Sequence, residues 1–227
     1  MIPMLDKIWF PILITFWIAT ISSLLVLCSG VIIAYVFARR DFRGKGLAEL
    51  FVTLPLVLPP TVIGYLLVVL VGKNGFIGQL IFKVLGTGIM FTWQAAVIAA
   101  YTVSLPLMVR TAKAAIEAVD KELEHAAYIL GRSELETALL ITLPLAKKGI
   151  LAGLVLSFAR AVGEFGATLM LAGNIPGKTN TMSISIYSAF QAGNNELAQV
   201  LVLILVILSL LSISLTGKFI DREKFEV

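Results

Sequence analysis

Long apolar stretches alternate with short polar ones along this chain, and this alternation is its main pattern. A membrane-spanning helix needs about 20 consecutive apolar residues, whereas the core helices of soluble domains rarely contain such runs. The pattern therefore predicts an all-α, polytopic membrane protein with about five transmembrane helices. The predicted spans are residues 8–38, 50–72, 84–109, 149–172 and 197–217.

The polar stretches between these spans divide the chain into three parts. Residues 1–45 are expected to form an N-terminal transmembrane helix and a basic loop, and residues 46–217 a membrane core. The core contains a polar stretch at 120–145, and residues 218–227 form a charged tail. Residues 76–85 are apolar but too short to span, so we expect them to lie at the membrane interface. The composition agrees, since 59% of the 227 residues are hydrophobic and mean hydropathy is +0.97.

The polar stretch 120–145 has the pattern of a small folded unit between two membrane spans. An apolar stripe at i, i+3, i+4 and i+7 predicts one short helix in which the charged residues, Glu124 included, face elsewhere. Gly131 then provides a residue that tolerates the left-handed helix end. Ser133 and Glu136 have the spacing of a capping box, which starts a second helix, and Pro144 marks another helix start or a bend. The stripe consists of Leu123, Ala126, Ala127 and Leu130.

Two unusual features inside the spans are candidates for a transport pathway or its gate. Pro59, Pro60 and Thr61 belong to a proline-rich segment that should bend the second span, and irregular backbone in a membrane often faces a cavity. The alternative is a kink that serves packing only. Arg160 and Glu164 stand four residues apart on what we expect to be one helical face of the fourth span. Such charges either form a structural ion pair between helices or line a watery path.

The distribution of basic residues predicts the topology. Most of the 18 lysines and arginines follow the first span, occupy the stretch between the third and fourth spans, or lie in the tail. Because basic residues are enriched on the cytoplasmic side, we expect those three regions in the cytoplasm, with the N-terminus outside and the C-terminus inside. The positive net charge is explained by topology, so it does not indicate nucleic-acid binding.

The sequence lacks the common motifs of catalysis and cofactor binding. It has no G-x-x-x-x-G-K-[ST] phosphate loop, no H-E-x-x-H motif and no G-x-S-x-G motif. With a single histidine and one cysteine, Cys28, it also has no metal-site pattern. We therefore expect no enzyme activity and no cofactor bound by this chain.

The polar stretch resembles the EAA loop of ABC importer permeases of the type I fold, whose pattern is E-A-A-x3-G-x9-I-x-L-P. The spacing fits throughout, with one departure: His125 stands where the glutamate is usual, and a glutamate precedes it. In that family the loop forms coupling helices that dock into a separate ATPase subunit. The residues that carry this resemblance are Glu124, His125, Ala126, Ala127, Gly131, Ile141, Leu143 and Pro144.

Further segments are similar to the molybdate branch of these permeases, and the resemblance covers essentially the whole chain. It implies a homodimer, two ATP-binding cassette ATPase subunits that bind the ATP and Mg²⁺, and an extracytoplasmic oxyanion-binding protein in a bacterial cytoplasmic membrane. It also implies import of molybdate by alternating access. Tungstate or sulfate remains an alternative substrate, and an ATP-independent secondary transporter a further alternative. The segments are residues 54–65, 75–78, 104–110, 158–168 and 174–179.

Overall fold

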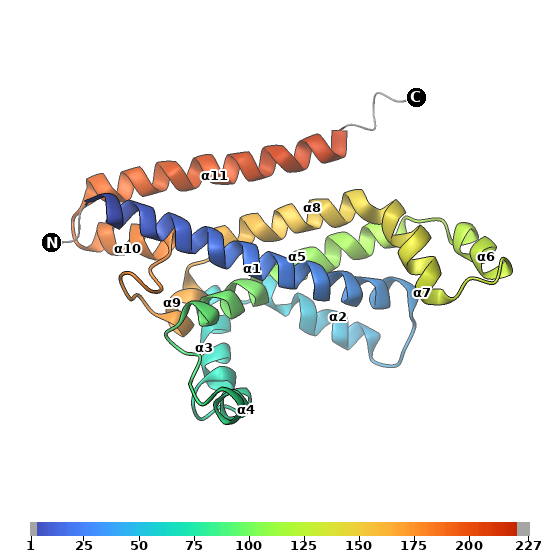
Figure 1. The fold of residues 1–227 in the computed structure, drawn as a ribbon, viewed down its shortest axis with the longest axis horizontal. Coiled ribbons are helices and arrows are strands. Elements are labelled where there is room, and N and C mark those ends of the chain that lie inside the picture. The colour runs from blue at the N-terminus through green and yellow to red at the C-terminus, as the bar shows by residue number, and fades with distance from the viewer. Residues whose placement is uncertain (1–3, 222–227) are drawn as a thin grey trace.

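The structure is a computed structural model that describes the backbone of residues 4–221, and within that range it contains helices but no strand (Figure 1). The predicted all-α fold is thus confirmed. The elements are α1 (Met4–Arg39), α2 (Lys45–Thr53), η1 (Leu54–Leu56), α3 (Pro60–Val71), α4 (Phe76–Leu85), α5 (Trp93–Glu117), α6 (Lys121–Ile129), α7 (Glu134–Thr137), η2 (Ala138–Thr142), α8 (Leu143–Val162), α9 (Gly166–Ala172), α10 (Met182–Gln191) and α11 (Asn195–Asp221).

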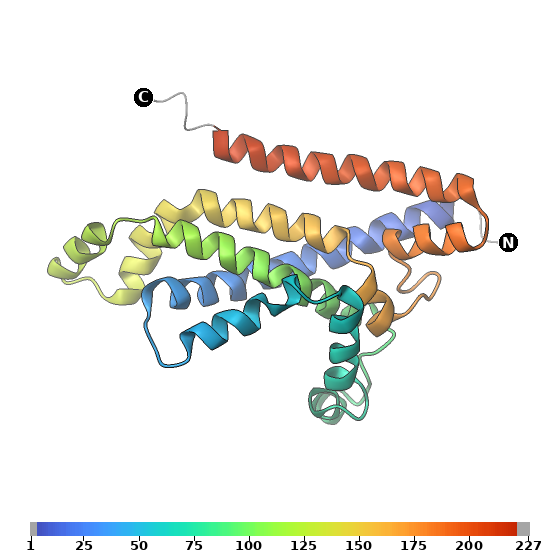
Figure 2. The same ribbon diagram turned by 180° about the vertical axis from the view of Figure 1, so that it is seen from behind.

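Three long helices, α1, α5 and α8, pack against one another and form the centre of the molecule, and α11 runs along α8 on the outside (Figures 1 and 2). Small side chains let these backbones approach closely, which is how membrane helices commonly pack. The core between α1, α5, α8 and α9 contains a set of fully buried alanines, namely Ala19, Ala95, Ala96, Ala99 and Ala100.

Three helices of the described chain are long and apolar enough to cross a membrane: Lys7–Arg39, Trp93–Glu117 and Glu134–Val162. The bent pair Lys45–Leu56 and Pro60–Val71 makes a fourth if it counts as one span. The fifth predicted span lies on α11, of which Asn195–Leu211 is a shorter apolar helix. Residues 222–227 of the predicted tail lie outside the described residues.

The second and third predicted spans differ from the prediction in shape and in boundary. The second is not one continuous helix, because the chain turns by 115° between η1 and α3. Pro59 and Pro60 explain the turn, since proline cannot donate a helical hydrogen bond. The third span begins at Trp93 and not at residue 84, because Gly86 adopts a left-handed φ of 69° and ends α4. The Thr92 side chain then accepts a hydrogen bond from the amide of Ala95 and caps α5.

The fourth predicted span is also broken. α8 ends at Val162, and a separate seven-residue helix, α9, begins at Gly166. The prediction that Arg160 and Glu164 share one helical face is therefore wrong: Arg160 lies in the last turn of α8, whereas Glu164 lies in the turn that follows. Gly163, at the end of α8, makes the break possible, because glycine weakens a helix.

Candidate functional site

The polar stretch forms two short helices that project from one end of the bundle (Figure 1). Asp120 caps the start of α6, because its side chain accepts a 2.9 Å hydrogen bond from the amide of Glu122. Gly131, just past the end of α6, has a φ of 82°. The amides of Gly131 and Arg132 donate to the carbonyls of Tyr128 and Ala127, the pair of bonds of a Schellman motif. The predicted glycine helix end is confirmed.

The second helix begins with the predicted capping box. The Ser133 amide donates to the Glu136 carboxylate at 2.9 Å, and the Glu136 amide donates to the Ser133 hydroxyl at 3.3 Å. α7 then continues through the π-helical segment η2 into α8, with Pro144 in the first turn of α8. Pro144 has no amide hydrogen to donate, and the wider π turn before it accommodates this without ending the helix. The loop and the membrane span are therefore one continuous helical segment.

The orientation of α6 differs from the prediction for one residue of the stripe. Leu123, Ala126 and Leu130 are exposed, but Ala127 is buried against the protein. Glu124, which was expected to face away from the stripe, is buried beside it. The predicted stripe is therefore divided: three of its residues face outward and Ala127 faces the protein. The charge of Glu124 is tolerated inside because it is paired.

His125 and Tyr128 lie on the exposed side of α6. Their rings are 6.4 Å apart, and neither side chain is enclosed. Partial burial and the neighbouring carboxylates of Glu124 and Glu134 raise the pKa of Tyr128, which therefore stays neutral. His125 occupies the motif position of a glutamate and is exposed, whereas the neighbouring Glu124 is buried.

Large apolar side chains are exposed around this loop. Ile129 is 86% exposed and Leu130 is 83% exposed, although both lie at a polar end of the molecule. Exposed apolar clusters rimmed by charges are typical of protein-binding surfaces. The surface can bury these groups against another protein. Its other members are Leu123, Leu135, Leu139 and Leu140, whereas Ile141 and Leu143 are half-buried and Pro144 is exposed.

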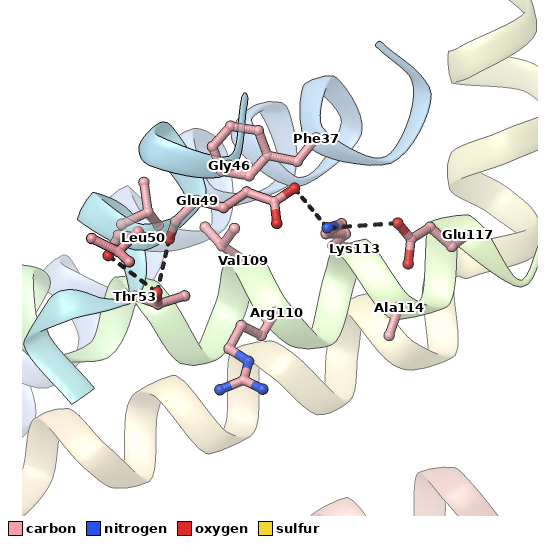
Figure 3. A pocket seen from close by; sticks show the side chains of 11 residues that line it. Phe37, Gly46, Glu49, Leu50, Thr53, Val109, Arg110, Lys113, Ala114 and Glu117 are labelled. Carbon is pink, nitrogen blue, oxygen red and sulfur yellow. Dashed lines mark hydrogen bonds and ion pairs between the residues drawn. The ribbon is translucent and has the colours of Figure 1, made fainter. Parts of the chain in front are cut away.

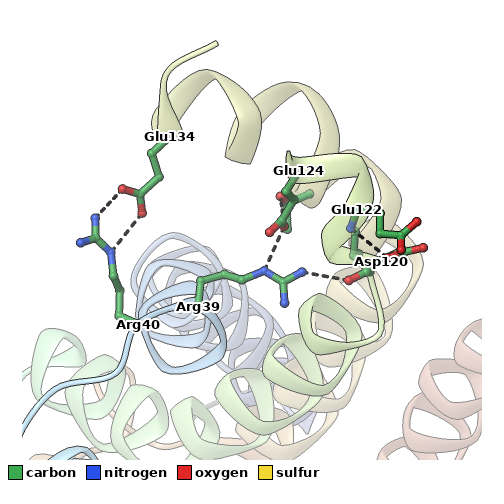
Figure 4. A network of polar contacts seen from close by, with 8 residues as sticks. Arg39, Arg40, Asp120, Glu122, Glu124 and Glu134 are labelled. Atoms are coloured by element: carbon green, nitrogen blue, oxygen red, sulfur yellow. Dashed lines mark hydrogen bonds and ion pairs between the residues drawn. The ribbon is translucent and has the colours of Figure 1, made fainter. Parts of the chain in front are cut away.

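Two arginines at the end of α1, Arg39 and Arg40, contact this loop, and sequence reasoning assigned them only to the basic loop (Figure 4). Arg39 Nε donates to Glu124 Oε1 at 2.9 Å, and the Thr142 hydroxyl donates to the same oxygen at 2.6 Å. Arg40 binds Glu134 through two hydrogen bonds, of 3.0 and 2.6 Å. No signal in the sequence connects partners that lie 85 and 94 positions apart.

The other predicted site residues meet where α3 packs against α9. Pro60 and Thr61 begin α3 directly opposite Gly166: a β-carbon on Gly166 would lie 3.0 Å from the Pro60 Cβ. Pro59 caps α3 and does not form part of the helix. The contact continues at Gly64, where a β-carbon would lie 2.7 Å from the Met170 Cβ. The chain breaks before α3 and α9 are thereby brought side by side.

Arg160 and Glu164 form an ion pair next to this contact. Arg160 Nη1 lies 2.8 Å from Glu164 Oε2, with side chains that are 30% and 2% exposed. The other carboxylate oxygen of Glu164 accepts a 2.8 Å hydrogen bond from the amide of Ala167 in the first turn of α9. Glu164 thus neutralises Arg160 and caps α9. This geometry favours the structural reading of the pair.

A cavity of about 490 Å³, which sequence reasoning missed, opens between α2 and α5 (Figure 3). Lys113 Nζ lies 2.7 Å from Glu49 Oε1 and 3.7 Å from Glu117 Oε1, and Arg110 also lines the cavity. In Figure 3 the guanidinium of Arg110 points away from the Glu49–Lys113 pair. Two carboxylates balance two cations, so the lining carries no excess of positive charge for an anion.

Comparison with known proteins adds a family and relatives. Residues 27–224 match the family model described as "Binding-protein-dependent transport system inner membrane component". The Molybdenum transport system permease protein ModB of Haemophilus influenzae is 44% identical over 200 residues, which are 88% of this chain and 87% of that protein. A protein of Chlorella vulgaris described as "Probable sulfate transport system permease protein cysT" is 34% identical over 95% of this chain and 80% of its own length.

Solved structures share the fold at low sequence identity. One is a chain of a bacterial ABC transporter involved in the import of the acidic polysaccharide alginate. It matches with a TM-score of 0.76 and 15% identity, over 96% of this chain and 80% of that one. At that identity the match concerns the fold alone.

Proposed function

Because this chain belongs to the family of binding-protein-dependent transport system inner membrane components, we propose that it is the permease subunit of an ATP-driven molybdate importer. The observation that carries the substrate is the 44% identity to a molybdenum permease over 88% of the chain. The proposed subunit spans the membrane several times and is not an enzyme. ATP hydrolysis belongs to a separate ATPase, since the sequence has no phosphate loop.

We propose that the α6–α7 surface is where the ATPase binds. Its exposed Ile129, Leu130 and Leu135 side chains would be covered there, and burial of apolar surface is the main favourable term in such contacts. Two copies of this chain, two ATPases and an extracytoplasmic oxyanion-binding protein would form the complete importer. The ATPase site requires α6 and the C-terminus to be cytoplasmic and the N-terminus to be outside, as the basic residues also predict.

Transport in this proposal occurs by alternating access, in which closure of the ATPases moves the α6–α7 loops and opens a path for the anion. The contact of α3 with α9 supplies the pathway, because two helices begin there beside broken backbone at Pro60 and Gly166. Free amides and hydroxyls such as that of Thr61 can contact a dianion weakly, which permits release as well as entry.

Sulfate is the second candidate substrate, because a sulfate permease described above is 34% identical over 95% of the chain. Tungstate shares the tetrahedral dianion chemistry of molybdate and is expected to compete with it. A secondary transporter predicts uptake by this chain without an ATPase.

The proposal is tested in liposomes that contain this chain with its ATPase and binding protein. We expect molybdate, and not sulfate at the same concentration, to stimulate ATP hydrolysis and to accumulate inside. Liposomes with this chain alone serve as the control and should accumulate nothing. Stimulation by sulfate alone would contradict the substrate, and uptake without the ATPase would contradict the ATP-driven mechanism.

A further inference from the structure

The side chain of Glu124 connects three elements: α6, to which it belongs, α1 and η2. Arg39 from α1 and Thr142 from η2 both donate to its Oε1 atom, at 2.9 and 2.6 Å. Arg39 also donates through Nη2 to the carbonyl of Val119, at 3.1 Å, just before α6 begins. The end of α1 is thus bonded to both the start and the middle of the segment that contains α6 (Figure 4).

This attachment matters because little else holds α6 to the bundle. Of its nine residues only Glu124 and Ala127 are buried, and alanine contributes little apolar contact area. α6 is joined to its neighbours through the turn at Asp120 and the left-handed turn at Gly131. The carboxylate of Glu124 therefore makes the principal non-covalent connection between α6 and the membrane helices.

The burial of the Arg39–Glu124 pair distinguishes it from the neighbouring Arg40–Glu134 pair. Both side chains of the first pair are 7% exposed, whereas those of the second are 60% and 45% exposed. An exposed pair exchanges readily with water and contributes little. A buried pair costs desolvation, so it adds little net stability, yet the loss of one partner strands a buried charge. Its geometry is consequently hard to break while the fold is intact.

We propose that the Arg39–Glu124 pair, supported by Thr142, makes α6 and α1 move as one body during transport. This rests on the proposed function, in which α6 is the part that the ATPase moves. Movement of the docked loop would then reach the membrane by two routes: through the continuous helix α7–η2–α8, and through the ion pair into α1. Glu124 is in this proposal a positioning residue, and the outward side chain at the motif position, His125, is the one that faces the ATPase.

The test uses the complete importer in liposomes and compares three variants of this chain. Glu124→Ala breaks the pair, and Arg39→Met with Glu124→Leu replaces it by apolar groups, which commonly preserves folding. Glu134→Ala breaks the exposed pair and is the matched control. We expect all three to retain the ATPase on purification. The first two should raise the ATP hydrolysed per anion imported by about fivefold or more, as is typical of lost coupling, and the control should not.

A second measurement follows the two helices directly. With Cys28 replaced by serine, spin labels are placed on Val36 of α1 and on Glu122 of α6, both outside the pair. In the native complex the distance between labels should stay the same with and without ATP. In the Glu124→Ala variant it should change between these states.

Three results would overturn the proposal. One is an unchanged ratio of ATP hydrolysed to anion imported in variants that still hold the ATPase. Another is loss of the ATPase from both Glu124 variants, which would mean that the pair only shapes the docking surface. The third is a native label distance that changes with ATP. Failure of the native importer to take up molybdate would instead contradict the substrate, and the label distances would still decide the role of the pair.

Discussion

Replacement of Glu164 by glutamine separates the two roles of this carboxylate. Glu164→Gln keeps an oxygen that accepts the amide hydrogen bond of Ala167, so α9 remains capped. It removes the negative charge that lies 2.8 Å from Arg160. The shape of the side chain is unchanged. Any effect therefore comes from the ion pair.

The size of the effect follows from the burial of the two groups. Breaking a fully buried pair costs about 3–5 kcal/mol, because one charge remains in an apolar environment. Arg160 is 30% exposed, so water partly compensates its charge, and the expected loss for Glu164→Gln is about 2 kcal/mol. Glu164→Ala also removes the helix cap, which adds about 1 kcal/mol. The exchange Arg160→Glu with Glu164→Arg should recover only part of the loss, since arginine cannot accept the Ala167 hydrogen bond.

The assay is unfolding of the purified chain in mixed detergent and SDS micelles, with uptake measured in parallel. Glu122→Gln is the matched control, because Glu122 is exposed on α6, and it should change stability by less than about 0.5 kcal/mol. The reasoning is refuted if Glu164→Gln leaves the free energy of unfolding unchanged while uptake falls about tenfold, which corresponds to about 1.4 kcal/mol. That result would assign Glu164 to the pathway.

Three further substitutions test packing, turn geometry and a partly exposed ion pair, each by the same unfolding measurement. Gly64→Ala should lower the free energy of unfolding by about 1–3 kcal/mol, because the new β-carbon would lie 2.7 Å from a methionine β-carbon. Gly46→Ala is the control and should cost nothing, since no atom lies within 4 Å of its β-carbon. Equal effects would contradict the close contact of α3 with α9. Gly131→Ala should cost about 1–2 kcal/mol because of the φ of 82° alone, since no atom lies within 4 Å of an added β-carbon. Gly131→Asn should cost less, because asparagine tolerates this left-handed conformation better. A loss no larger for alanine than for asparagine would count against a conformational cause. Lys113→Gln should cost less than about 1 kcal/mol, since Lys113 and Glu49 are 23% and 31% exposed, and a larger loss would mean that the cavity pair is stronger than its exposure implies.

The local structure of the α6–α7 loop could be predicted because its determinants are close in sequence. The capping box at Ser133 and Glu136 and the left-handed Gly131 each depend on a few neighbouring residues, and the structure contains both. The all-α fold likewise follows from the length of the apolar stretches. The domain boundaries, the coupling role of the loop and the homodimer stay predictions.

The errors concern features that local sequence does not determine. Glu124 was expected to face away from the apolar stripe, yet it is buried beside Ala127 of that stripe because its partner Arg39, 85 positions away, holds it there. The break after Val162 was missed because glycine is also frequent within membrane helices, so Gly163 did not by itself indicate a helix end. The prolines predicted a bend in the second span, but not its angle of 115°, which depends on the packing of α3 against α9.

α8 lies between two irregular points of the backbone, so in the proposed mechanism it acts as a lever. Its 20 residues correspond to a rod of about 30 Å, with the π turn at one end and the chain break before α9 at the other. A tilt of about 10° around the π turn would displace the far end by about 5 Å, almost the pitch of one helical turn. In the proposed mechanism, a small rotation at the α6–α7 end would thus reach the contact of α3 with α9 as a displacement of several ångström.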